Sequence, residues 1–173
     1  MDVIFDHWQG ENLSDVIQSI AMFRKQVLSN VSYFQTQSLS NEINALQHYF
    51  DAESVVIVAN DGGHIVGYIS LVNELETHSN LGEYAYYGPD LMVSEGPIVH
   101  SDYCGQGIAK GLITEAIQVC QDRCVEALIF DPSGIRTDEL DPVIQAISAS
   151  FGFEKRLNKA TNECYYQRIL SDE

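Results

Sequence analysis

Apolar residues recur along the chain with two different periods, which separate the expected helices from the expected strands. A spacing of three and four residues, typical of an amphipathic helix, occurs in residues 12–27 and again in residues 41–50. The inward-facing positions of these two stretches are Val16, Ile20, Phe23 and Val27, followed by Ile43, Leu46 and Phe50. We expect Asn12 or Ser14 to cap the first helix and Ser40 to precede the second.

Short β-branched and apolar runs predict the strands. They lie at residues 1–5, 54–59, 65–72, 91–99 and 125–130, with one or two more within 153–170. Asp61-Gly62-Gly63 is the strongest hairpin signal, and Gly96-Pro97 interrupts the strand at 91–99. The run 125–130 is apolar except at Glu126, and we expect a strand that is buried on both faces.

Two further helices and a loop complete the predicted order. The helices cover residues 107–122 and 141–152, and residues 74–89 form a polar loop that contains Tyr84, Tyr86 and Tyr87. This order predicts a single α/β domain over residues 1–173, an α+β mixed sheet with antiparallel N-terminal strands followed by a βαβ unit. A chain of 173 residues that is 45% hydrophobic and 20% charged suits one globular domain and excludes general disorder.

The net charge of the chain argues against two classes of binding partner, nucleic acids and anionic membranes. Subtracting 25 acidic residues from 9 basic ones gives a formal net charge of −16. Binding to nucleic acid or to an anionic membrane needs clustered Lys and Arg, which the sequence lacks, so we expect neither partner. Two interpretations of the excess acid stay open: an acidic face for a cationic partner such as an amine, or an even spread that only favours solubility.

The ends and the cysteines indicate a cytoplasmic protein. The first residues do not resemble a secretory signal, and the longest apolar run, residues 55–59, is too short to span a bilayer. Cys104, Cys120, Cys124 and Cys164 are too few for a disulfide scaffold, so we expect reduced thiols.

A glycine-containing turn after the strand at 91–99 is the most informative segment. The turn opens the helix at Gly107, which directs backbone N–H groups and the positive end of the helix dipole at one point, as in a phosphate site. The sequence Gly107-Ile108-Ala109 excludes a P-loop, which needs Gly-Lys-Ser/Thr. A dinucleotide-binding turn, with Asp131 as ribose ligand and NAD as cofactor, lacks its third glycine and has too little chain after it.

The segment Cys104-Gly105-Gln106-Gly107-Ile108-Ala109 resembles motif A of the GNAT superfamily of acyl-CoA-dependent N-acyltransferases, whose pattern is Q/R-x-x-G-x-G/A. The surrounding order of elements and the pair Gly152-Phe153 also resemble this family, most clearly over residues 54–153. The resemblance implies a GNAT-like fold with splayed central strands, acetyl-CoA as co-substrate, no metal, an amine acceptor and a homodimer.

The resemblance also implies roles for individual residues. The pyrophosphate of coenzyme A would bind the turn, which comprises Cys104, Gly105, Gln106, Gly107, Ile108, Ala109 and Lys110. Ile98 and Val99 would pair with the pantetheine amides like an added strand. Asp141 and Ser148 stand where the family usually has Asn and Tyr.

Three positions depart from the family pattern. Cys104 replaces Arg or Gln and removes one polar arm from the phosphate site. Ser148 replaces the tyrosine that often protonates the departing thiolate, and Pro97 has no N–H where a backbone donor often polarises the acyl carbonyl.

Acetyl transfer to an amine needs a group that accepts the amine proton, and Glu95 is our candidate, acting directly or through water. A period of two places Val93, Glu95, Pro97 and Val99 on one face of the strand, provided that Gly96 introduces no bulge. The alternative for Glu95 is an ordinary solvated carboxylate. Ser148 would orient the departing sulfur, and its alternative is a helix serine bonded to its own backbone. The loop tyrosines could supply a phenol.

The remaining candidate chemistry is weaker. His100 and Cys104 could form a nucleophilic pair, but no third, orienting residue is evident. Cys120 and Cys124 share a helical face without partners for zinc, so buried thiols are expected there. The sequence therefore predicts an N-acetyltransferase that transfers an acetyl group from acetyl-CoA to a primary amine of a small molecule, peptide or protein. The alternative is a non-catalytic acyl-CoA-binding sensor of the same fold.

Overall fold

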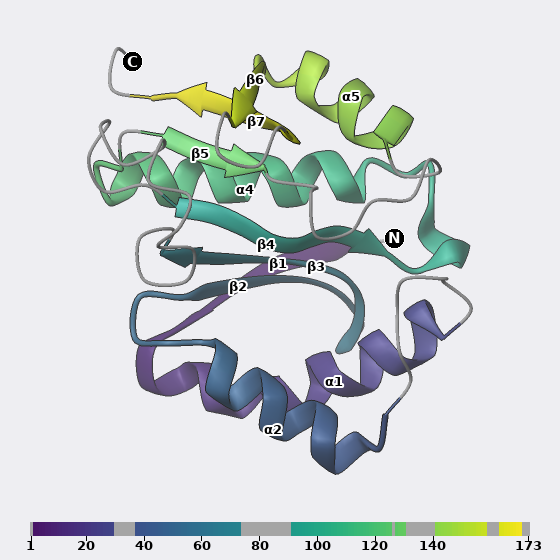
Figure 1. Ribbon diagram of the computed structural model, residues 1–173. Coiled ribbons are helices and arrows are strands. Elements are labelled where there is room, and N and C mark those ends of the chain that lie inside the picture. The colour runs from purple at the N-terminus through teal and green to yellow at the C-terminus, as the bar shows by residue number, and fades with distance from the viewer. Residues whose placement is uncertain are drawn as a thin grey trace. The chain divides into compact units, whose positions relative to one another are not determined.

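The computed structural model describes residues 2–29, 37–73, 91–125, 127–130, 141–158 and 163–170 (Figure 1). The strands are β1 (Val3–Gln9), β2 (Val55–Asp61), β3 (His64–Asn73), β4 (Leu91–Val99), β5 (Ala127–Phe130), β6 (Glu154–Asn158) and β7 (Glu163–Ile169). The helices are α1 (Ser14–Leu28), α2 (Leu39–Tyr49), α4 (Ile108–Asp122) and α5 (Asp141–Ser150), with short 3-10 turns η1 (Gly10–Leu13) and η3 (Ser101–Tyr103).

The strands form a seven-stranded mixed sheet in the order β1-β2-β3-β4-β5-β7-β6. This confirms the predicted mixed α/β class with antiparallel strands first. The predicted loop at 74–89, with its three tyrosines, and Asp131 lie outside the described residues.

The chain divides into two compact units. The first comprises Met1–Leu71 with Glu95–Ala116, and the second comprises Val72–Ser94 with Ile117–Glu173. The assignment of residues 1–173 to a single domain stays a prediction.

In the first unit, β1, β2 and β3 pair antiparallel, and the predicted hairpin is confirmed. Asp61 pairs with His64 across a two-residue turn in which Gly62 and Gly63 have φ values of 57° and 86°. Left-handed conformations at both central residues match the twist of the flanking strands, which explains the two glycines.

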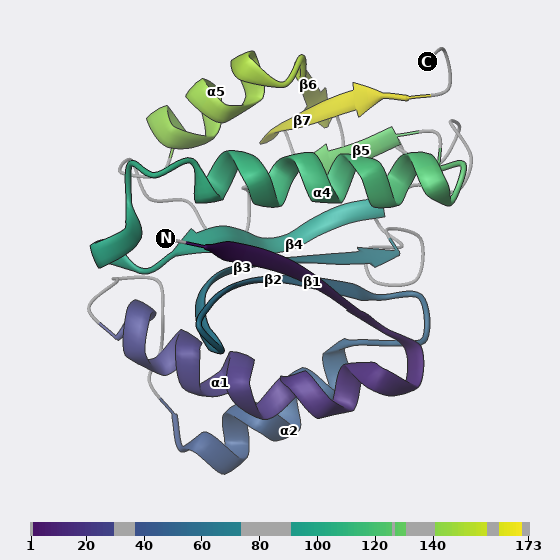
Figure 2. The same ribbon diagram turned by 180° about the vertical axis from the view of Figure 1, so that it is seen from behind.

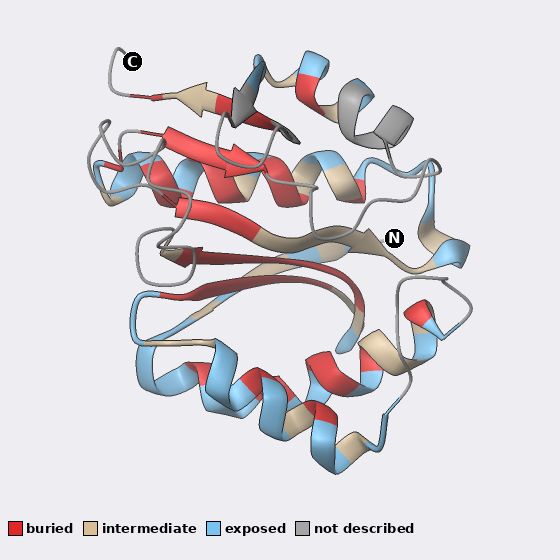
Figure 3. Cartoon of the chain, in the orientation of Figure 1, coloured by how far each residue is buried: buried red, intermediate tan, exposed pale blue. Residues whose placement is uncertain are grey.

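Apolar side chains cover both faces of these strands. On one face, α1 and α2 pack through Val16, Ile20 and Leu46 against Val58 and Tyr68. Buried residues recur along both helices between exposed ones, and they fill most of β2 and β3 (Figure 3).

The other face of these strands carries the N-terminal half of α4. A Cβ added at Gly111 would collide with the ring of Phe5 in β1, and one at Gly67 in β3 would lie 3.3 Å from Ile108 Cγ2. Seen from behind, β1 and this half of α4 lie side by side (Figure 2). The two glycines therefore let the helix approach the strands closely.

The predicted helix caps are wrong at both helices. Ser38, which has an extended backbone, caps α2 by accepting a hydrogen bond from Asn41 N at 3.2 Å, while Ser40 lies inside the helix. At α1 the chain enters through η1 and is already helical at Leu13, so no extended residue is available as a cap. Ser14 Oγ instead donates to Glu11 O at 3.1 Å.

In the second unit, the start of β4 pairs parallel with β5, from Leu91–Leu128 to Val93–Phe130. All four residues of β5 are buried, as predicted. The described pairs between β4 and β5 extend to Val93–Phe130, and β4 itself continues to Val99. The splayed central strands stay a prediction. β7 pairs antiparallel with both β5 and β6.

Candidate functional site

The turn between β4 and α4 has an open, left-handed backbone. After η3 and the extended Cys104, Gly105 and Gly107 have φ values of 79° and 81°. Apart from the adjacent residues of the chain, no atom of the described residues lies within 4 Å of a Cβ added at either glycine, so these residues leave the space in front of the turn open. Left-handed backbone is costly for other residues, and the open space leaves room for a ligand to approach the main chain.

The start of α4 keeps its positive potential. Gly107 O accepts the hydrogen bond of Gly111 N at 3.0 Å, so the N–H groups of Ile108, Ala109 and Lys110 precede the first helical hydrogen bonds. α1 and α2 carry Asp15 and Glu42 in their first turns, whereas the first turn of α4 has no acidic residue and contains Lys110. In a chain with 25 acidic and 9 basic residues, this turn is well suited to an anion.

The end of β4 presents main-chain groups in two directions. His100 N donates to Val66 O of β3 at 2.8 Å, and Ile98 O would lie 2.9 Å from a Cβ at Gly67. The main chains of Ile98 and His100 therefore face β3. Because these directions alternate along a strand, the N–H and C=O of Val99 point away from β3.

Gly96 interrupts the regularity of β4. It has a φ of 102°, and a Cβ at this position would lie 2.6 Å from Tyr68 O. The Gly96–Pro97 peptide bond is cis. The backbone is not extended at Gly96, so the period of two does not extend from Glu95 to Pro97, and a shared face for Glu95 and Val99 no longer follows.

Glu95 is held by a guanidinium group. Arg24 Nε donates to Glu95 Oε1 at 2.6 Å, and Arg24 Nη2 donates to Glu95 Oε2 at 2.8 Å. Arg24 Nη1 forms an ion pair with Glu42 Oε1, and Gln37 Nε2 donates to Glu42 Oε2 at 2.7 Å. The Glu95 side chain is 19% exposed, so the alternative of an ordinary solvated carboxylate is wrong.

The sequence did not identify Arg24 or Glu42, although a weak signal existed. Glu42 lies four residues before Leu46, on the inward face of its helix, and Arg24 lies four residues after the buried Ile20. A charged residue on an apolar stripe is seldom buried without a partner of opposite charge.

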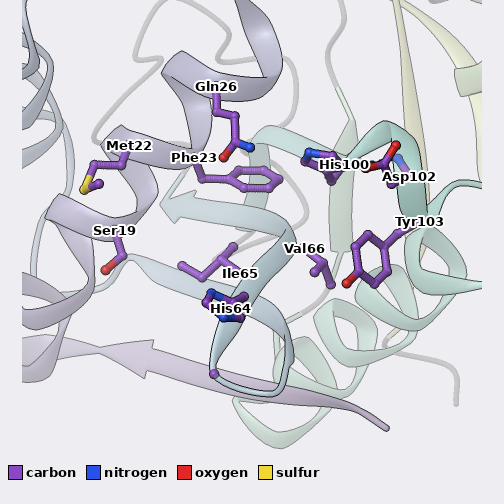
Figure 4. Close-up of a pocket in the computed structure, with 11 residues that line it drawn as sticks. Ser19, Met22, Phe23, Gln26, His64, Ile65, Val66, His100, Asp102 and Tyr103 are labelled. Atoms are coloured by element: carbon purple, nitrogen blue, oxygen red, sulfur yellow. Dashed lines mark hydrogen bonds and ion pairs between the residues drawn. The ribbon is translucent and has the colours of Figure 1, made fainter. Parts of the chain in front are cut away.

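A pocket of about 490 Å³ lies beside the turn, between α1, the start of β3 and the η3 segment (Figure 4). Phe23 and Gln26 of α1, His64 of β3, and His100 and Tyr103 contribute to its walls. Figure 4 shows Gln26 and Phe23 on one side of the pocket and Tyr103 on another.

Tyr103 joins the turn to the β2–β3 hairpin. Its hydroxyl donates to Asp61 Oδ2 at 2.9 Å. This hydrogen bond, together with desolvation and the negative charges of Asp61 and Asp102, raises the pKa of Tyr103 above its ordinary value of 10.0. The Tyr103 phenol is therefore a neutral hydrogen-bond donor at neutral pH.

His100 and Cys104 do not meet as a thiol–imidazole pair. Cys104 Sγ donates to the backbone carbonyl of His100 at 3.7 Å, and His100 Nδ1 accepts from Asp102 N at 3.1 Å. Cys120 is buried as predicted, but Cys124 is exposed because it follows α4 in a left-handed conformation with a φ of 56°.

Ser148 and Asp141 belong to α5 in the second unit. The Ser148 side chain is 2% exposed, and its Oγ has no hydrogen-bond partner among the described residues. The alternative in which this hydroxyl bonds to its own backbone is therefore wrong. Asp141 is the first residue of α5, and its side chain lies outside the described residues.

Within the described ranges, no group of three or more His, Cys, Asp or Glu residues could hold a metal ion. None of the helices in the described part of the chain has the length and apolar character needed to cross a bilayer.

The comparisons with known proteins agree with this geometry. The model of the acetyltransferase (GNAT) family matches residues 20–138. No curated protein sequence gives a significant match. Among solved structures, the ribosomal-protein-alanine N-acetyltransferase from Brucella melitensis is 19% identical, with a TM-score of 0.65 over 96% of this chain and 99% of that one.

Two further structures have the same fold at lower identity. An acetyltransferase from Thermus thermophilus is 14% identical, with a TM-score of 0.65 over 98% of both chains. AAC(6')-Iy, in complex with the bisubstrate analogue CoA-S-monomethyl-acetylneamine, is 14% identical, with a TM-score of 0.64 over 89% of this chain and 92% of that one.

Proposed function

The chain belongs to the acetyltransferase (GNAT) family, and we propose that it transfers an acetyl group from acetyl-CoA to a primary amine. The first turn of α4 carries this proposal. Open space faces Gly105 and Gly107, and a lysine stands where α1 and α2 have an acidic residue. Such a turn suits the pyrophosphate of coenzyme A, and the residues present therefore fit the co-substrate.

The residues proposed to bind the co-substrate divide into two groups. The amides of Gly105, Gln106, Gly107, Ile108 and Ala109, with the exposed Lys110 ammonium, would hold the pyrophosphate. The N–H and C=O of Val99 would pair with the pantetheine amides, while Ile98 would fix the strand against β3. Cys104 borders the turn without the polar arm of an Arg or Gln. Asp141 stays a proposal by its match to the family pattern.

Glu95 is the proposed partner of the acceptor amine. Acetyl-CoA supplies a thioester, whose carbonyl carbon forms the new bond to nitrogen as its bond to sulfur breaks. Positive charge develops on the attacking nitrogen, and a fixed carboxylate stabilises that charge before the proton passes to water. A thiol with a pKa of about 8.5 leaves readily as thiolate, so Ser148 needs only to orient the sulfur. This role for Ser148 stays a proposal by its match to the family pattern.

We propose a cationic acceptor, because the net charge of −16 favours the approach of amines. Two structural neighbours suggest the acceptors to test: an alanine of a ribosomal protein, from the name of the Brucella melitensis enzyme, and neamine, from the acetylneamine analogue. We also propose a cytoplasmic location, because four cysteines are too few for a disulfide scaffold.

A sensor that binds acetyl-CoA without turnover is the second candidate. It is favoured by one observation: both oxygens of Glu95 already accept hydrogen bonds from Arg24, so Glu95 is not an unengaged base. Measured turnover of any amine would exclude this candidate.

Calorimetric titration with acetyl-CoA, with NAD as control, tests the proposal. We expect saturable binding of acetyl-CoA and none of NAD. A screen with an Ala-initiated peptide, neamine and 1,4-diaminobutane, followed by release of the free thiol, then tests transfer. Absence of acetyl-CoA binding by the folded protein would remove the proposed function, whereas binding without turnover would favour the sensor.

A further inference from the structure

Three charged side chains from three separate elements form one connected cluster in the first unit. Arg24 of α1 forms two parallel hydrogen bonds to Glu95 of β4, at 2.6 and 2.8 Å, and an ion pair with Glu42 of α2. We call Arg24, Glu42 and Glu95 the carboxylate clamp. Residues 24 and 95 are 71 positions apart in the sequence, so only the folded unit brings them together.

Glu42 is the most buried member of the carboxylate clamp. The Glu42 side chain is 1% exposed, whereas those of Arg24 and Glu95 are 16% and 19% exposed. A buried carboxylate must be paired and hydrogen-bonded, and Glu42 receives both Arg24 and the Gln37 amide. Glu42 therefore fixes the guanidinium, and the rigid, planar fork of the guanidinium fixes the plane of the Glu95 carboxylate.

Glu95 keeps accepting capacity after Arg24 is bound. Each carboxylate oxygen has two acceptor positions, and the two hydrogen bonds from Arg24 use one on each oxygen. Two carboxylates and one guanidinium leave the carboxylate clamp with a net charge of −1. A partly exposed, oriented carboxylate with residual negative charge is suited to an N–H donor that gains positive charge.

We propose that Arg24 and Glu42 are positioning residues for acetyl transfer, which hold Glu95 in the orientation that receives the acceptor amine. This inference rests on the proposed function and names the residues that make Glu95 effective. The competing explanation is that the carboxylate clamp only holds α1 and α2 against β4. Loss of Arg24 would then affect stability but not the rate of the folded enzyme.

The test separates position from stability with paired variants. Arg24→Ala alone leaves the buried Glu42 carboxylate without its cation, which destabilises the fold. The double variant Arg24→Ala/Glu42→Gln removes that unpaired charge, so the folded protein can be assayed. Arg24→Lys keeps the charge but loses the fork. Lys25→Met is the matched control, because it removes a neighbouring, partly buried cation from the same helix.

Acetyl-CoA affinity, measured by calorimetry, is the readout that does not depend on activity. We expect the double variant to bind acetyl-CoA within about twofold of wild type, because the turn lies outside the carboxylate clamp. With the acceptor that the wild type acetylates best among the Ala-initiated peptide, neamine and 1,4-diaminobutane, we expect kcat to fall about tenfold or more. The kcat of Arg24→Lys should lie between the values of wild type and the double variant. The kcat of Lys25→Met should match that of wild type.

Chemical rescue provides a readout that a merely structural role would not move. Methylguanidine should restore part of the kcat of Arg24→Ala, whereas tetramethylammonium, a cation without N–H donors, should not. Wild-type kcat and KM in the double variant would overturn the proposal, as would a loss of kcat that tracks lost acetyl-CoA binding. A wild-type protein that acetylates none of the three acceptors would instead refute the proposed function, before any variant is compared.

Discussion

The glycine turn and the carboxylate clamp are both in the first unit, and their construction is opposite. The turn consists of contiguous residues, from Gly105 to Lys110, and most of it is exposed. The carboxylate clamp takes one residue from each of α1, α2 and β4, and Glu42 is almost fully buried. The turn carries a helix N-terminus and a lysine, whereas the clamp has a net charge of −1.

This contrast matches the two reactants proposed for the enzyme. A positive, open turn suits an anionic co-substrate, and a negative, partly exposed carboxylate suits an amine. It also predicts different consequences of substitution. Changes in the turn should affect binding more than folding, because a contiguous exposed segment supports little of the core. Changes in the clamp should affect folding first.

The largest expected effect comes from Arg24→Met, which leaves the buried Glu42 without its cation. Removing one partner of a buried ion pair typically costs about 3–5 kcal/mol of the free energy of unfolding. Urea denaturation of Arg24→Met and of Arg24→Met/Glu42→Gln measures this cost. We expect the second substitution to recover most of it, and equal instability of both variants would contradict a role for the unpaired charge.

Gly107→Val should have the next largest effect, because it distorts the turn that is proposed to bind acetyl-CoA. A β-branched side chain at a φ of 81° strains the backbone and fills the open space, so acetyl-CoA should bind about 100-fold more weakly or worse. Gly152→Val is the matched control, because Gly152 has a φ of 75° and equally open surroundings. Both variants should lose similar stability, but calorimetry should show weakened binding only for Gly107→Val.

The glycine turn could be predicted from sequence because its chemistry is local. The spacing of Gly105 and Gly107 between a strand and a helix already requires left-handed backbone and a free helix N-terminus. The hairpin at Gly62-Gly63 was predictable for the same reason: two adjacent glycines permit the turn without any contact from elsewhere.

The carboxylate clamp could not be predicted, because its members are separated by long stretches of chain. The sequence shows Glu42 and Arg24 beside apolar helix positions. It does not show that Arg24 contacts both Glu42 and Glu95 in the folded unit. The period of two expected along β4 failed at Gly96 for a related reason. Gly96 has a left-handed backbone, and Tyr68 O on a neighbouring strand leaves no room for a Cβ there, which no local pattern reveals.

Lys110→Met should have a smaller effect than Gly107→Val on acetyl-CoA binding. Lys110 is exposed, so its loss should weaken acetyl-CoA binding only about two- to fivefold, and the difference should disappear at high salt. Lys25→Met serves as the control for general loss of a positive charge. A Lys110→Met protein that binds acetyl-CoA like wild type at low salt would remove this side chain from the phosphate site.

Tyr103→Phe should have the smallest effect, because it removes a single hydrogen bond between η3 and the β2–β3 hairpin. The bond to Asp61 raises the pKa of Tyr103, so its contribution to stability is fully present below pH 10.0 and is lost as pH rises through the higher pKa of the folded state. Thermal unfolding from pH 7 to pH 11 measures this dependence. Wild type should unfold at a slightly higher temperature than Tyr103→Phe at neutral pH, and the difference should shrink in alkali. A difference that stays constant to pH 11 would mean that the hydroxyl stabilises the turn without the protonated phenol donating to Asp61.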